Sequence, residues 1–266
     1  MKYTNIIKSI VFLSALSLSG CKDKETEEAP GIPERILIWS DEFEGTTLDE
    51  TKWNIYHQER IKPGGPLAWW DRDNISVEGG HLVVKTSRRT DGVYASGAIN
   101  TQNKYENTYG YYEIRVKLQK EQGHWGAFWL FTPGVNTTTG NRQGKDGTEI
   151  DIFESPFIGL GQDRVQSALH YDGYAAQHRS TEKSTYNMGL NDGNWHTFAV
   201  DWTPLWYRFY YDDVMVWETN FGGVSRVPQF MIISDEVGAW GGLIDITRAN
   251  LPDYMLVDYV RVYNRK

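Results

Sequence analysis

The fold class is decided by the stretch Tyr111-Tyr112-Glu113-Ile114-Arg115-Val116-Lys117-Leu118. The charged residues Glu113, Arg115 and Lys117 alternate in it with residues that are all apolar or aromatic. A period of two is the pattern of a β-strand that has one buried and one solvent-facing side. We therefore predict that 111–118 forms one wall of a hydrophobic core.

Short runs of β-branched and aromatic residues recur on both sides of this strand. We expect further strands at 36–39, 75–77, 81–86, 149–153, 165–171, 195–202, 206–211, 229–234 and 254–263. Turn signals separate them, such as Gly79-Gly80 and Asn191-Asp192-Gly193, and no helical stripe competes. Many short strands with regular turns are typical of two antiparallel sheets packed as a sandwich. The sequence therefore predicts an all-β fold.

The composition favours one large domain and an uncharged partner. The chain has 266 residues, of which 40% are hydrophobic and 23% are charged, enough to bury a sizeable core in a water-soluble fold. The formal net charge is -8, so there is no excess of cations to neutralise phosphates, and we exclude a nucleic acid partner. The 11 Trp and 16 Tyr suit stacking on the apolar faces of sugar rings.

Residues 1–20 have the pattern of a bacterial lipoprotein signal peptide. The basic Lys2 and Lys8 come first, and an apolar run at 10–18 follows that is too short to span a bilayer. Leu18-Ser19-Gly20-Cys21 then resembles a lipobox, in which Cys21 is lipidated. Because Cys21 is the only cysteine, a disulfide within the chain and a thiol catalyst are both excluded.

Residues 21–34 are charged and lack apolar periodicity, so we predict a flexible tether. An acidic stretch directly after a lipidated cysteine resembles the surface-export signals of Bacteroidetes lipoproteins. We therefore expect a lipid-anchored protein of the outer membrane, exposed at the cell surface, whose single folded domain spans 35–266 and is monomeric.

Three acids crowd into Gly147-Thr148-Glu149-Ile150-Asp151-Ile152-Phe153-Glu154. In a regular strand Glu149 and Asp151 point to one face, and Glu154 points to the other. A β-bulge near Ile152-Phe153 would return Glu154 to the face of Glu149, and bulges are common beside active sites. Acids on a solvated strand face are ordinary, but the apolar neighbours here indicate a central strand. Like charges on such a strand raise one another's pKa values.

Paired carboxylates of this kind can cleave a glycosidic bond. Hydrolysis with retention of configuration needs one ionised carboxylate as nucleophile and one protonated acid about 5 to 5.5 Å away. Asp151 could hydrogen-bond Glu149 and help to keep the two glutamates in different protonation states.

The segment 149–154 closely resembles the signature of glycoside hydrolase family 16, Glu-x-Asp-x-x-Glu in its bulged form. Further matches to the family follow in its order, at 39–43, 49–53, 109–115, 125–130, 169–171, 195–198 and 258–263. The resemblance covers 39–263 and implies a β-jelly-roll sandwich like that of concanavalin A. It also implies a substrate cleft across the concave sheet.

The resemblance implies a role for each acid: Glu149 is the nucleophile, Asp151 assists it and Glu154 is the acid/base. It also implies sugar contacts, which we expect at Trp125, Trp129, His170, Asn103, Trp69, Trp70 and Glu236. We expect His170 beside Glu154, and Trp69 and Trp70 exposed on a Pro/Gly-rich loop. Core positions for Trp125 and Trp129 are equally consistent with their spacing, since alternation places both on one face without saying which.

No cofactor is implied, although some relatives in the family bind a structural calcium, which the region of Asp258 would hold here. The motifs most resemble those of β-1,3- and β-1,3-1,4-glucanases, so we expect an endo-acting retaining glucanase. An endo-β-galactosidase acting on galactan or mucin-type chains is the second interpretation. The acidic chain disfavours sulfated substrates, although Arg60, Arg72 or Arg142 could bind a sulfate.

Two further interpretations involve no chemistry. A lectin-like sandwich could serve as a surface glycan-binding protein, but a pure binder has no need of crowded acids. A structural surface lipoprotein would explain the tether but neither the acids nor the aromatic residues.

Overall fold

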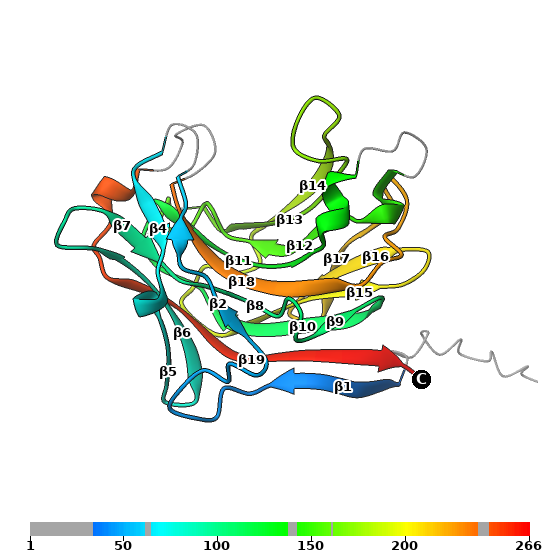
Figure 1. Cartoon of the computed structure of the whole chain (residues 1–266), viewed down its shortest axis with the longest axis horizontal. Helices are drawn as coiled ribbons and strands as arrows, with labels where there is room; N and C mark the ends of the chain where they lie inside the picture. Colours follow the sequence, from blue (N-terminus) through cyan, green and yellow to red (C-terminus); the bar gives the residue numbers. More distant parts are fainter. Residues whose placement is uncertain (1–33, 62–64, 138–142, 161, 239–244) are drawn as a thin grey trace, which may run out of the picture. The chain divides into compact units, whose positions relative to one another are not determined.

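A computed structural model describes residues 34–61, 65–137, 143–160, 162–238 and 245–266. The predicted leader, the tether through Pro33, Cys21 and Arg142 lie outside these described residues. Residues 34–266 form one compact unit made of two stacked sheets (Figure 1). Among the described residues, no helix has the length and apolar character that a membrane span requires.

The strands have the following bounds: β1 Arg35–Asp41, β2 Asn54–Ile55, β3 Gln58–Glu59, β4 Ala68–Trp70, β5 Ile75–Glu78, β6 His81–Arg88, β7 Tyr94–Ser96, β8 Ala98–Asn100, β9 Glu106–Asn107, β10 Gly110–Lys117, β11 His124–Phe131, β12 Glu149–Glu154, β13 Arg164–Tyr171, β14 Arg179–Tyr186, β15 His196–Trp202, β16 Tyr207–Tyr211, β17 Val214–Thr219, β18 Gln229–Val237 and β19 Asp253–Arg265. Four 3-10 helices are described, at η1 Arg72–Asn74, η2 Pro133–Asn136, η3 Gln143–Asp146 and η5 Ile246–Arg248.

The larger sheet has the strand order β17-β16-β15-β10-β19-β6-β7-β4-β3. The long strand β19 lies at its centre, where it pairs with β10 on one side and with β6 and β1 on the other. Figure 1 shows β1 and β19 side by side. Pairing among the described strands is antiparallel except between β4 and β7, which confirms the predicted sheet type.

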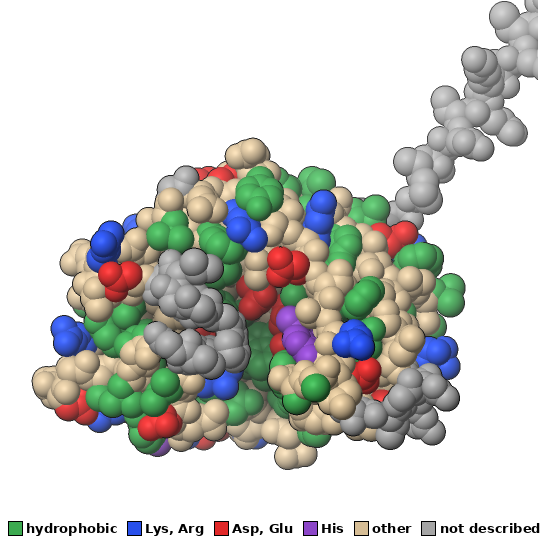
Figure 2. All heavy atoms as spheres, turned by 90° about the horizontal axis from the view of Figure 1, so that it is seen from above, with side chains coloured by type: hydrophobic (Ala, Val, Ile, Leu, Met, Phe, Trp, Pro, Cys, Tyr) green, Lys and Arg blue, Asp and Glu red, His purple; other side chains and the backbone are tan. Residues whose placement is uncertain are grey.

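The smaller sheet has the order β14-β13-β12-β11-β18-β8-β2. Its outer face is hollowed, and acidic and histidine side chains line the hollow (Figure 2). The three acids lie on β12, which is an interior strand of this sheet, with β11 on one side and β13 on the other.

The core lies between the two sheets and follows from the alternation in the sequence. Ile114 and Val116 of β10 are fully buried, whereas the charged residues that alternate with them reach solvent. The two buried residues of β10 pack in one cluster with Phe128 of β11, Ile150 of β12 and Val260 of β19. All ten predicted strands are present, and the all-β sandwich is confirmed.

Candidate active site

The predicted β-bulge is present in β12 and brings the three acids to one face. Glu149 pairs with His170, Asp151 with Ala168 and Glu154 with Gln166, which are alternate residues of β13 and so share a face. Ile152 and Phe153 together occupy the interval that one residue of β13 spans, and both are fully buried in the core. The extra residue thus turns Glu154 outward beside Glu149.

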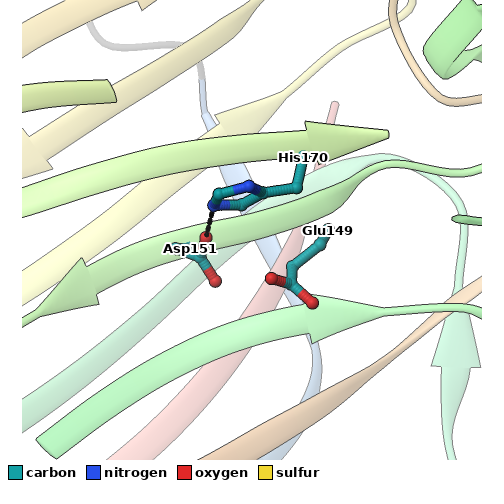
Figure 3. A group of neighbouring side chains, drawn as sticks. All are labelled: Glu149, Asp151 and His170. Atoms are coloured by element: carbon teal, nitrogen blue, oxygen red, sulfur yellow. Dashed lines mark ion pairs between the residues drawn. The ribbon is translucent and has the colours of Figure 1, made fainter. Parts of the chain in front are cut away.

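A tyrosine and two histidines surround the candidate nucleophile. Figure 3 shows Glu149, Asp151 and His170 pointing toward one another, with Nε2 of His170 3.3 Å from Oδ2 of Asp151. The hydroxyl of Tyr174, in the loop between β13 and β14, donates a hydrogen bond to Oε2 of Glu149. His178 stacks on His170, and Nε2 of His178 lies 3.0 Å from Nδ1 of His170.

Burial raises the pKa of Glu149 to about 8, and repulsion from Asp151 adds to this rise. Burial alone raises the pKa of Asp151, also to about 8. Both adjacent acids are therefore hard to ionise near neutral pH. His170 and the Tyr174 hydrogen bond lower the pKa of Glu149 and so favour its charged form.

Glu154 accepts a hydrogen bond from Nε2 of Gln166 at 3.1 Å. The prediction that His170 lies beside Glu154 is wrong, because the register of β13 places His170 opposite Glu149, four residues away from Gln166. Tyr174, His178 and Gln166 were not predicted from the sequence. Tyr174 and His178 lie in the turn that follows β13, the strand that pairs with the acids. Their place after that strand is the signal that could have predicted these two residues.

Trp125 and Trp129 lie on the face of the acids rather than in the main core. Trp129 is opposite Asp151, and its indole Nε1 donates to Oγ of Ser234 at 3.0 Å. Together with Ala127 and Leu160 the two tryptophans form a small cluster separate from the core between the sheets. They therefore lie on the face of the acids, where sugar contacts were predicted, and not at the alternative core positions.

Trp70 does not have the predicted exposure, and Glu236, a predicted sugar contact, is buried as well. Glu236 is buried on β18, and its Oε1 accepts from Nε of Arg60 at 2.8 Å. Trp70 is also buried, since β4 joins the larger sheet and its indole donates to the backbone oxygen of Asp235 at 3.0 Å. Arg60 lies 4.2 Å over the ring of Trp70, so the partly exposed group at this place is Arg60.

Trp69 and Asn103 lie away from the acids. Side chains alternate along β4, so Trp69 points to the side opposite Trp70, where it packs against His57. Trp69 and Trp70 therefore do not form the predicted exposed pair, and a glycan contact at Trp69 stays a prediction. Asn103 is exposed in the turn after β8, three strands from β12 in the sheet order. A sugar contact at Asn103 stays a prediction. Arg72 is paired with Glu50 at the surface.

The predicted calcium does not fit the residues around Asp258. That carboxylate forms an ion pair with Arg115, which already neutralises it, and lies 3.6 Å from Nδ1 of His81. Glu149, Asp151 and His170 offer ligand atoms within 4.8 Å of one another. A metal there would compete with protons, because burial raises the pKa of both acids and a metal needs them ionised.

The comparisons with known proteins concern the family and the fold. A family model described as the GH16 domain of β-porphyranases A to D matches residues 35–265. A β-glucanase of Rhodothermus marinus is 28% identical, over 99% of this chain and 96% of its own. A keratan-sulfate endo-1,4-β-galactosidase of Sphingobacterium multivorum is 29% identical, over 85% of this chain and 54% of its own.

Among solved structures, the laminarinase catalytic domain of Thermotoga maritima superimposes with a TM-score of 0.71 and 27% identity. It covers 88% of this chain and 99% of its own. The match of the family model over nearly all of the described unit settles the family. This chain belongs to glycoside hydrolase family 16 and is a glycoside hydrolase.

Proposed function

We propose that this protein is an endo-acting glucanase that cleaves β-1,3- and mixed-linkage β-1,3-1,4-glucan with retention of configuration. The observation that carries the proposal is the placement of Glu149, Asp151 and Glu154 on one face of β12 by the bulge. That face forms part of a hollowed surface, which suits the interior of a polymer rather than its end (Figure 2). A hydrolase that uses paired carboxylates needs no cofactor.

In the first step, the ionised carboxylate of Glu149 attacks the anomeric carbon. The bond from that carbon to the glycosidic oxygen breaks, and Glu154 transfers its proton to the leaving oxygen. The hydrogen bond from Tyr174 favours the ionised form of the attacking carboxylate before the attack.

In the second step, water replaces the departed sugar. Glu154, now a carboxylate, removes a proton from the water while the oxygen of the water bonds to the anomeric carbon. The ester bond to Glu149 breaks, and both acids return to their starting states. Two displacements at one carbon retain the β configuration.

The β-glucanase and laminarinase relatives support a glucan as substrate. A galactose-containing chain is the second candidate, and it is favoured by the porphyranase family model and by the similarity to an endo-1,4-β-galactosidase. Arg60 in the hollow would suit an anionic sugar, but Glu236 already neutralises its charge. Reducing-sugar release from laminarin, mixed-linkage β-glucan, agarose, keratan sulfate and porphyran decides between them, and release from none of these would leave a non-catalytic glycan-binding protein.

The roles of the two glutamates can be separated with substrates that have an activated leaving group. Glu149→Ala should abolish turnover but keep glycan binding. Glu154→Ala should still form the glycosyl-enzyme from an aryl glycoside, and added azide should release it as the β-glycosyl azide. Any azide product of Glu149→Ala should be the α-anomer. Opposite configurations would exchange the two roles, and near-normal activity of Glu154→Ala on glucan would refute them.

We infer further that Cys21 anchors a monomeric catalytic domain to the outer membrane, at the cell surface. The lipobox-like pattern at 18–21 and the acidic stretch after it support this inference. Cys21→Ala should move the protein from the membrane fraction to a soluble fraction, and externally added protease should degrade the wild-type protein on intact cells. Unchanged membrane association of Cys21→Ala would contradict the anchor.

A further inference from the structure

A second groove lies on the far side of the sandwich from the three acids. The residues of β6 that face the core are Leu82, Val84 and Thr86, all fully buried. Lys85 and Ser87 therefore point outward from the larger sheet, away from the smaller sheet and its catalytic face. Figure 1 shows β5 and β6 at the lower left, on the side of the molecule away from β12.

Two adjoining hollows make up this groove. One has a volume of about 650 Å³ and includes Trp69 and Lys85, and the other has a volume of about 360 Å³ and includes Lys85 and Tyr254. They share Lys85 with Asp73 and Asn74, so the groove runs continuously from Trp69 to Tyr254. Each of the two volumes is within the range of small-ligand sites.

The floor of the groove is rigid. Nδ2 of Asn74 donates to the backbone oxygens of Lys85 and Ala95, at 2.8 and 2.9 Å, and lies 3.0 Å from Oγ of Ser87. This side chain ties η1 to β6 and β7, so the groove exists before a ligand arrives. A preformed surface loses little entropy on binding.

An aromatic side chain stands at each end of the groove. Trp69 is half-buried, and its indole packs against His57 with ring centroids 5.5 Å apart. Tyr254 is 43% exposed on β19. Flat aromatic faces at both ends of a polar groove fit the apolar faces of sugar rings, while the charged groups between them fit hydroxyls.

The charges of the groove favour an uncharged ligand. Four acids line it, Asp71, Asp73, Glu78 and Asp91, against the two cations Lys85 and Arg89. Arg89 is engaged by Asp71 and Asp91, at 3.3 and 3.1 Å. A sulfated or phosphorylated chain would meet net repulsion here.

We propose that this groove is a second glycan site, which holds an uncharged β-linked glucan chain while the cleft cleaves the same polymer. The choice of glucan rests on the proposed function, but the existence of the site does not. The groove adds affinity for long chains because a chain bound at one site is present at a high effective concentration near the other.

The test measures binding in the Glu149→Ala background, where no substrate is consumed. Electrophoresis through gels that contain mixed-linkage β-glucan should show a weaker retardation of Trp69→Ala/Tyr254→Ala, with Kd raised roughly five-fold, the scale of losing aromatic contacts. In gels that contain porphyran instead of glucan, the parent and the double variant should migrate alike. With Glu149 restored, kcat/KM on a short oligosaccharide should stay within about two-fold of wild type.

Trp125→Ala serves as the cleft control and should lower both polymer binding and oligosaccharide turnover. Tyr254→Ala alone, at a surface position, covers the case in which the double variant does not fold. Equal retardation of parent, double variant and Tyr254→Ala would overturn the second site. Loss of oligosaccharide turnover by the folded double variant would place the groove residues in the cleft instead. If wild-type enzyme hydrolyses neither glucan, the proposed function fails, while the gel result still reports on the groove.

Discussion

At the scale of single residues, Tyr174 favours the charged form of Glu149. Its hydrogen bond lowers the pKa of Glu149, which burial and Asp151 raise. We predict that Tyr174→Phe raises that pKa, so the acidic limb of the kcat/KM profile moves to higher pH. The profile of wild type and variant on a soluble glucan checks this. Tyr186→Phe, at a similarly exposed tyrosine of β14, is the control and should not move the limb.

His124 is a second residue whose charge matters, but for stability. It is fully buried, with Nδ1 2.6 Å from Oδ2 of Asp235 and Nε2 3.2 Å from Oδ2 of Asp253. Burial lowers the pKa of His124, but the two aspartates outweigh it and raise the pKa to about 9. Since the unfolded value is about 6.5, the stabilisation is complete below pH 6.5 and is lost as the pH rises through 9.

We therefore predict that the free energy of unfolding falls by on the order of 3 kcal/mol between pH 6 and pH 9.5 through this group. Denaturant titrations at the two pH values measure it. His124→Gln should be destabilised by roughly 3 to 5 kcal/mol at pH 6, because it leaves two buried acids without their cation, and it should lack most of the pH dependence. If wild type and His124→Gln lost the same free energy of unfolding between the two pH values, groups other than His124 would cause the pH dependence.

The sequence predicted the three acids because their spacing and a single bulge bring them together on one strand. It did not predict Tyr174 or His178, which reach Glu149 and His170 through the path of a loop. It misplaced Trp70 because a Pro/Gly-rich neighbourhood suggested a loop, whereas pairing of β4 with β7 buries the ring. Contacts set by tertiary pairing leave no periodic signal in the sequence.

At the scale of elements, the start of β12 depends on one glycine. Gly147 has a φ of 152°. A Cβ there would lie 2.7 Å from the backbone carbon of Gly134 and from the backbone nitrogen of Val135. We predict that Gly147→Ala shifts the strand that carries Glu149, with a loss of stability of about 3 kcal/mol and of most activity. Gly80→Ala, where a Cβ meets nothing within 4 Å, should lose only about 1 kcal/mol and keep its kcat.

The elements that the sequence missed have physical reasons for being missed. β14 has polar residues on both faces because it is the last strand of the smaller sheet, so it shows no alternation. β11 reads as a continuous apolar run because Phe128 faces the core while Trp125 and Trp129 line the catalytic face. A strand that is covered on both sides hides its period.

At the scale of the whole molecule, the hollowed face predicts how products appear. A surface open along its length binds the middle of a chain, so oligosaccharides of several lengths should form early, and their new reducing ends should be β before mutarotation. Chromatography of early digests and proton NMR measure the two. Monosaccharide as the sole early product would contradict internal cleavage, and early α-anomer would mean inversion.

The position of β19 has a consequence for how the protein is made. This strand, at 253–265, lies between β10 and the pair β6 and β1, which precede it by more than a hundred residues. On the ribosome, the larger sheet therefore has a gap through its middle until residue 265 has been added. Such late, non-local closure delays folding. A nascent chain that cannot close this sheet before β19 is made remains unfolded and can pass through a secretion pore, as the proposed lipoprotein export requires.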